Sequence, residues 1–102
     1  MKTMNRMVNV AVQVLPEGGG SISYALVDEA IRVIAESGYT YRVCPFETVV
    51  ECTLEEAMAL IAGIHQAVES AGADRMLTYV KIQSDFSGDV AISDKMRKYD
   101  KF

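Results

Sequence analysis

The stretch PFETVVECTLEE, residues 45–56, decides the fold. Pro45 predicts a tight turn, because proline presets the backbone for a turn and cannot donate to a sheet. The β-branched residues after the turn predict a strand over residues 48–52. Thr53 and Glu56 have the spacing of a capping box, in which each side chain accepts a bond from the other residue's backbone amide. A helix therefore begins directly after the strand.

The same kind of pattern continues on both sides of this stretch. Hydrophobic and polar residues alternate over residues 7–15, and apolar residues recur at helical spacing in two longer segments. Ser21 or Ser23 can cap the first helix and Ser93 a short last one, whereas Gly38 and Gly72 end the two long helices. The elements expected along the chain are strands at 7–15, 39–44, 48–52 and 76–82, helices at 24–37, 54–70 and 94–99, and loops at 16–20 and 83–89.

The element order is strand, helix, strand, strand, helix, strand. Right-handed crossovers place both long helices on one face of a four-stranded antiparallel sheet. The sequence therefore predicts an α+β fold, the ferredoxin-like βαββαβ sandwich, with a single domain over residues 1–102 and a short C-terminal helix.

The other face of such a sheet needs a cover. We expect apolar side chains on this open face, namely those of Ala11, Leu77, Tyr79 and Tyr41. An exposed apolar patch of this kind marks an interaction surface. A homodimer or homotetramer is the expected cover, and the alternative is that the C-terminal segment folds back over the face.

Composition excludes several classes of function. The chain has 102 residues and a net charge of −4, with no basic cluster of the kind that binds nucleic acid. No segment has the length of a membrane-spanning helix or the composition of a signal peptide. No metal-ligand spacing is present, and no cofactor is expected. Cys44 and Cys52 are too far apart in the expected hairpin to form a disulfide, so we expect free thiols and a cytoplasmic protein.

Glu51 is the first candidate for chemistry, because it lies near the end of a strand that is otherwise apolar. A carboxylate there can accept a charge-assisted bond from a protonated nitrogen heterocycle. Alternatively, it caps the following helix or pairs with Arg42 or Lys81. Thr48 is the second candidate, but residues three apart in a regular strand point to opposite faces, so a shared pocket would require a bulge.

Three further side chains are weaker candidates. Ser23 and Tyr24 lie at the start of the first helix, where a ligand or an ordinary helix cap can use the same atoms. Phe46, at the hairpin tip, can stack on a flat ring or pack against another subunit. His65 falls on the polar side of the second helix and is expected to be a surface residue. No nucleophile or acid–base pair of an enzyme is evident.

The hairpin resembles the signature of a small family of thiamine-binding proteins, and the resemblance extends from about Val8 to Met96. That family has a proline, a threonine and a glutamate at the positions of Pro45, Thr48 and Glu51. Glu47 and Cys52 depart from it, since the family has glycines there. The other matching positions are Glu36, Ser37 and Gly38 at a helix end, Arg75, Lys81 and Ile82 in the last strand, and Lys95.

The resemblance implies a dimer or a dimer of dimers that binds thiamine or its hydroxymethylpyrimidine half without catalysis. It implies that Glu51 bonds the ring nitrogen and that Thr48 orients Glu51 or accepts from the amine. Ser23, Tyr24 and Phe46 would then line the pocket, because the fold places them nearby. The alternatives are a structural or regulatory homo-oligomer without a small ligand and an enzyme for a small substrate.

Overall fold

The computed structural model describes residues 5–100. Its elements lie close to the expected ones, and the terminal bounds shift by a few residues. They are β1 (Met7–Gly18), β2 (Ser21–Ile22), α1 (Tyr24–Glu36), β3 (Thr40–Val43), β4 (Thr48–Thr53), α2 (Leu54–Ser70), β5 (Arg75–Gln83) and α3 (Ile92–Met96).

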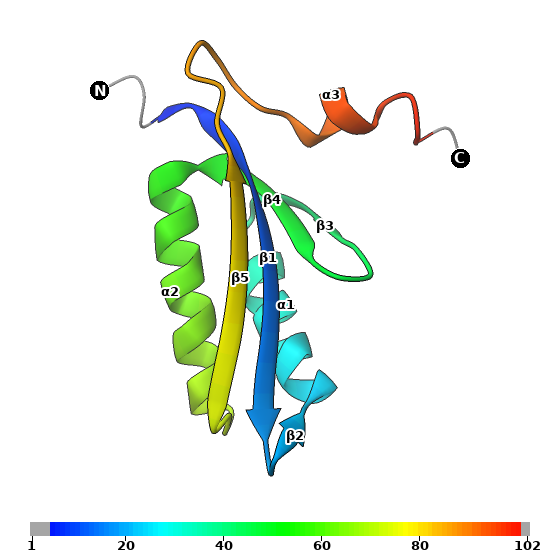
Figure 1. Cartoon of the computed structure of the whole chain (residues 1–102). Helices are drawn as coiled ribbons and strands as arrows, with labels where there is room; N and C mark the ends of the chain where they lie inside the picture. The colour runs from blue at the N-terminus through cyan, green and yellow to red at the C-terminus, as the bar shows by residue number, and fades with distance from the viewer. Residues whose placement is uncertain (1–4, 101–102) are drawn as a thin grey trace.

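The sheet is antiparallel and has the ferredoxin-like order. Strand β1 lies in the middle, with β5 along one edge and β4 along the other, and β3 pairs with the far edge of β4. Both long helices lie on one side of this sheet, and α3 lies at the end of the sheet where β1 begins (Figure 1). The predicted α+β sandwich is therefore confirmed.

The glycine-rich segment after β1 differs from the expected loop. Strand β1 continues to Gly18, and the short strand β2 pairs with Glu17 and Gly18. Gly19 and Gly20 form the turn with φ of 67° and 90°. A two-residue hairpin turn with positive φ at both positions suits the twist of the strands and favours glycine, so this segment is a hairpin extension of the sheet.

Both long helices start where their capping residues predict. Ser23 Oγ accepts a bond from the Leu26 amide at 3.3 Å, which makes Ser23 the N-cap of α1. The predicted capping box of α2 is complete: Thr53 Oγ1 accepts from the Glu56 amide at 3.2 Å, and Glu56 Oε1 accepts from the Thr53 amide at 2.9 Å. These bonds satisfy amides that a helix start otherwise leaves unpaired.

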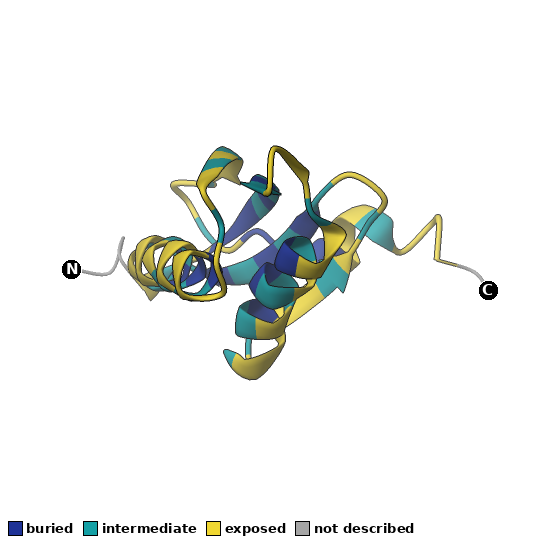
Figure 2. Cartoon of the chain, turned by 90° about the horizontal axis from the view of Figure 1, so that it is seen from below, coloured by how far each residue is buried: buried dark blue, intermediate teal, exposed yellow. Residues whose placement is uncertain are grey.

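The core lies between the sheet and the two long helices. Buried residues, dark blue in Figure 2, occupy the middle of the molecule, while the outer sides of the helices are exposed. The buried side chains of the sheet and the long helices are Val8, Val10, Val12, Val14, Leu26, Ala30, Ile34, Val50, Cys52, Ala57, Leu60, Ile64 and Val68. The alternation of β1 thus places its four valines on the helix side.

Two expectations for this region are corrected. Tyr41 pairs with Val50, and because directly paired residues share a sheet face, Tyr41 lies on the helix side and not on the open face. The last helix covers Ile92–Met96 with Ala91 as its N-cap, so Ser93 lies inside the helix and does not cap it. The buried Ile92 side chain fixes this earlier start, since it anchors the helix to the sheet.

The buried thiol of Cys52 predicts an alkaline loss of stability. Burial, with a smaller contribution from the Glu56 carboxylate, raises the pKa of Cys52 from 9.0 to about 11. Below pH 9 the thiol is protonated in both states, and above it the unfolded chain ionises first, so stability falls as pH rises toward 11. Two pKa units correspond to roughly 2–3 kcal/mol.

Urea unfolding between pH 8 and about pH 11, spanning this range, checks that prediction. The Cys52→Ala variant serves as the control, because it lacks the titrating group and its stability should fall less steeply. Parallel curves for the two proteins would contradict the assignment. Cys44 is also a free thiol but is only partly buried, so a thiol reagent should modify Cys44 before Cys52.

Candidate functional site

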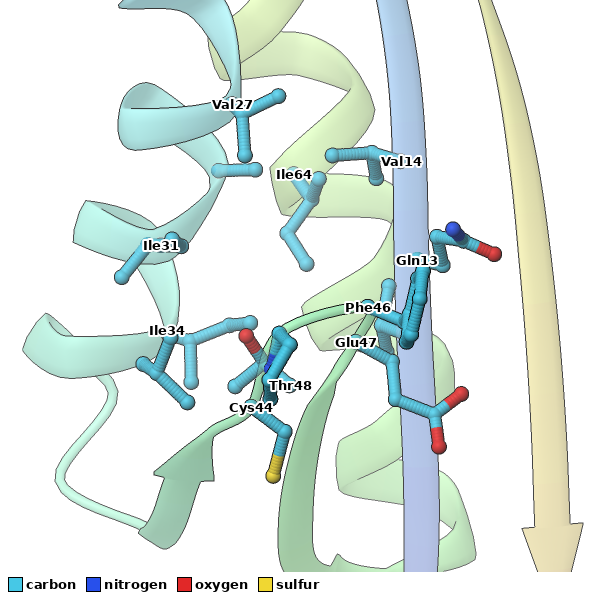
Figure 3. Close-up of a pocket in the computed structure, with 14 residues that line it drawn as sticks. Gln13, Val14, Val27, Ile31, Ile34, Cys44, Phe46, Glu47, Thr48 and Ile64 are labelled. Carbon is cyan, nitrogen blue, oxygen red and sulfur yellow. The ribbon is translucent and has the colours of Figure 1, made fainter. Parts of the chain in front are cut away.

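The hairpin between β3 and β4 closes one side of a pocket, which we call the hairpin pocket. It has a volume of about 80 Å³ and lies between the hairpin, α1 and the middle of β1. Figure 3 shows α1 on one side, β1 on the other, Ile64 of α2 behind, and the hairpin between them across the lower part of the view. The residues that line it are Val12, Gln13, Val14, Val27, Ala30, Ile31, Ile34, Val43, Cys44, Pro45, Phe46, Glu47, Thr48 and Ile64.

The hairpin turn sets the geometry of this pocket. The Cys44 amide donates to the Glu47 carbonyl at 2.9 Å, which confirms the two-residue turn at Pro45 and Phe46. Thr48 follows and pairs with Val43 and with Val12. Since both partners lie on the helix side, the Thr48 side chain also points between the sheet and the helices.

Phe46 and Thr48 give the pocket two different kinds of surface. Thr48 is 5% exposed, so its hydroxyl is a polar group in a largely apolar wall. Phe46 is 81% exposed and belongs to the pocket rim. The Glu47 carboxylate points away from α1 in Figure 3 and pairs with Lys81 at 3.0 Å. A flat ring with an N–H group can therefore stack on Phe46 and bond Thr48 without meeting a charge.

Glu51 lies on the opposite face of β4. It pairs with Asn9 and Thr40, and the pairing of β1 with β4 is continuous from Thr48 to Thr53. Because this strand contains no bulge, Thr48 and Glu51 point to opposite faces. The resemblance implies that Thr48 and Glu51 act on one ligand. Within a single chain they point to opposite faces of β4, so this expectation is corrected.

The Glu51 carboxylate has a partner that the sequence did not predict. Its Oε1 accepts a bond from the Ile92 amide at 2.7 Å, at the start of α3. Arg42 pairs with Asp100 and Lys81 with Glu47, so the expected ion pair of Glu51 with either cation is wrong. Glu51 is partly buried and holds the C-terminal segment against the open face.

Ser23 and Tyr24 lie outside the hairpin pocket. Ser23 uses its hydroxyl to cap α1, as the alternative interpretation predicted. Tyr24 is 82% exposed in the first turn of that helix. The structure thus brings Phe46 and Thr48 together at one pocket and leaves Ser23, Tyr24 and Glu51 apart from it.

Comparison with known proteins identifies the family of this chain. The family model described as thiamine-binding protein matches residues 10–100. The chain belongs to the thiamine-binding protein family. It is 31% identical over 91 residues to a UPF0045 protein of Clostridium perfringens, and the match covers 89% of this chain and 95% of the relative.

Solved structures of similar proteins share the fold of this thiamine-binding family member. A Bacillus cereus domain of unknown function, DUF77, matches with a TM-score of 0.89 and 32% identity, over 97% of this chain and 95% of the other. A Thermotoga maritima protein assigned provisionally to thiamine biosynthesis or salvage matches with a TM-score of 0.82 and 29% identity, over 91% and 98%.

Several pocket residues of this family member belong to the apolar periodicity of the first long helix and carried no sign of a binding site. The apolar stripe of α1 includes Val27, Ile31 and Ile34, and all three line the hairpin pocket. Val27 and Ile31 are only partly buried, unlike the fully packed Ile34. Periodicity shows which side of a helix faces the sheet, but it does not show where a pocket remains between the helix and the sheet.

Removing the Glu51 carboxylate should release the C-terminal segment. Glu51→Ala leaves the Ile92 amide without its acceptor, and we expect a loss of about 1–3 kcal/mol in unfolding free energy. Hydrogen exchange at the Ile92 amide should accelerate, and Glu69→Ala, an exposed residue of α2, is the matched control. Unchanged protection of Ile92 in Glu51→Ala would refute this anchoring role.

Proposed function

We propose that this chain binds thiamine or its hydroxymethylpyrimidine half in the hairpin pocket and does not catalyse a reaction on it. The observation that carries the proposal is the match of the thiamine-binding protein family to residues 10–100. The hairpin pocket has the apolar walls and the placed polar group that are typical of small-molecule sites. Its volume of about 80 Å³ is below the roughly 300 Å³ of sites that enclose a drug-sized ligand, so the ligand would extend past the Phe46 rim.

The pyrimidine is chemically suited to Thr48 and Phe46, the two predicted site residues that line the hairpin pocket. The aminopyrimidine has an exocyclic amine and ring nitrogens, and the Thr48 hydroxyl can accept from the first or donate to the second. Phe46 offers an exposed ring face at the rim. In this proposal Ser23 and Glu51 keep their structural roles, and neither they nor the exposed Tyr24 contact the ligand.

Calorimetry tests the function with the purified full chain. Thiamine and hydroxymethylpyrimidine should both give saturable heats, and hydroxymethylpyrimidine should be sufficient because it contains the groups that the pocket recognises. Absence of heat for both ligands at millimolar concentration would overturn the proposal. A turnover assay in which the ligand is consumed would overturn the assignment as a binding protein.

A second candidate is a structural or regulatory homo-oligomer, and the open face favours it. Leu77 and Tyr79 of β5 are half exposed there, and within the described residues β5 pairs with β1 alone. An exposed edge strand and an apolar patch both favour association. Analytical ultracentrifugation should show a dimer or tetramer, and association without any ligand heat would favour this candidate over the first.

The last part of the proposal concerns the cellular compartment of the protein. No helix in residues 5–100 is long and apolar enough to cross a bilayer. Both cysteines are free, as is usual for proteins of a reducing compartment. We therefore place the binding function in the cytoplasm, and localisation of a tagged chain tests this part of the proposal.

A further inference from the structure

The open face of the sheet contains a second hollow, which we call the roofed groove. Its floor is formed by Asn9, Ala11 and Val49, and its roof by Ile92, Lys95 and Met96 of α3. It consists of two adjoining hollows of about 280 and 250 Å³ that share Asn9, Val49 and Lys95. The sheet lies between the groove and most of the hairpin pocket, and Cys44 and Glu47 of the hairpin line both.

On the floor of the roofed groove, Asn9 has a side-chain oxygen that accepts no hydrogen bond from residues 5–100. It is 4% exposed, and its Nδ2 donates to the Val90 carbonyl at 3.0 Å. Its Oδ1 is buried and has no donor within residues 5–100. A buried carbonyl oxygen without a donor costs roughly 1–3 kcal/mol, so a donor from a bound molecule would be favourable there.

Lys95 gives the roofed groove a positive charge that no acid neutralises. Its Nζ lies 2.7 Å from the neutral Gln83 Oε1 and forms no ion pair within the described part of the chain. The other charges around the groove are already paired. Lys81 holds Glu47 at 3.0 Å, and Arg42 is paired with Asp100.

The inner hollow of the groove is largely apolar, whereas Glu47, Lys81 and Gln83 line the outer hollow. Val49, Ile92 and Met96 line the inner hollow, next to Asn9 and Lys95. A complementary molecule therefore has an apolar body, an anionic oxygen for Lys95 and an O–H or N–H donor for Asn9. We propose that the roofed groove binds a small organic acid that carries a hydroxyl or amino group.

This site differs from the proposed thiamine site in the charge of the ligand that it favours. Thiamine is a cation, so the Lys95 ammonium disfavours it, whereas the hairpin pocket lacks a lining cation for an acid. Failure of one site therefore leaves the other untouched. The two sites also lie on opposite faces of β4, as the positions of Thr48 and Glu51 show.

An NMR titration of the full chain with 4-hydroxybenzoate tests the proposal. This probe has an apolar ring, a carboxylate and a hydroxyl, while benzyl alcohol lacks the carboxylate and benzoate lacks the hydroxyl. We expect saturable shifts at the amides of Asn9, Val49 and Met96 with 4-hydroxybenzoate. Benzoate should bind more weakly, and benzyl alcohol should bind weakest of the three.

Two lysine variants provide the decisive comparison. Lys95→Gln should weaken 4-hydroxybenzoate binding about tenfold, because a charge-assisted bond is lost. Lys98→Gln removes an exposed lysine that does not line the groove and should leave the affinity unchanged. The absence of saturable shifts in the wild type, as expected if only water satisfies Asn9, would overturn the proposal, as would equal affinities for both variants.

Discussion

Replacing Thr48 with valine should weaken hydroxymethylpyrimidine binding about tenfold while the fold stays intact. Valine keeps the β-branched shape that the strand and the buried position require. It removes the one hydroxyl that we place against the pyrimidine amine, and a ligand group left unpaired inside a pocket costs roughly 1–3 kcal/mol. Calorimetry of both proteins measures the loss.

The control for that variant lies on the other face of the same hairpin. Thr40→Val changes an exposed threonine of β3 that pairs with Glu51 on the open face. Its affinity for hydroxymethylpyrimidine should equal that of the wild type. If Thr40→Val lost affinity and Thr48→Val kept it, the ligand would bind on the open face and not in the hairpin pocket.

The second large effect concerns the wall that the core and the hairpin pocket share. Ile64 of α2 is fully buried and contacts both. Ile64→Ala should lower the unfolding free energy by roughly 2–5 kcal/mol, because it removes buried methylene groups and leaves a cavity. Urea unfolding at neutral pH measures this change.

Met58→Ala is the matched control for Ile64→Ala, since it shortens a half-exposed side chain on the same helix. We expect its effect to stay within about 1 kcal/mol, as is usual for surface positions. A similar loss in both variants would mean that this side of α2 does not pack as described.

The sandwich could be predicted because its signals are local. The alternating valines of β1, the capping box at Thr53 and the turn at Pro45 each act within a few residues. Gly38 and Gly72, both with positive φ, follow the two long helices and end them by an equally local signal. Each signal favours the same element order, so the topology follows from them together.

The site could be predicted only in part, because long-range contacts decide it. The Glu51–Ile92 bond joins residues 41 positions apart, and the Asn9–Val90 bond joins residues 81 positions apart. No local pattern indicates that the C-terminal segment reaches Glu51. By contrast, the period of two along a strand shows which face each side chain occupies. The sequence therefore already predicted that Thr48 and Glu51 point to opposite faces.

The same limit explains the missed hairpin at Gly19. Its glycines predict a turn, but the pairing of Glu17 with Ile22 depends on how far β1 continues beyond Pro16. Proline ordinarily ends a central strand. Here it remains inside β1, where it pairs with Met76.

A crystal structure of the full chain soaked with hydroxymethylpyrimidine tests the central claim most directly. We expect the pyrimidine ring in the hairpin pocket, against Phe46 and within hydrogen-bond distance of Thr48 Oγ1. A ring found on the open face beside Glu51, with the hairpin pocket unoccupied, would contradict it.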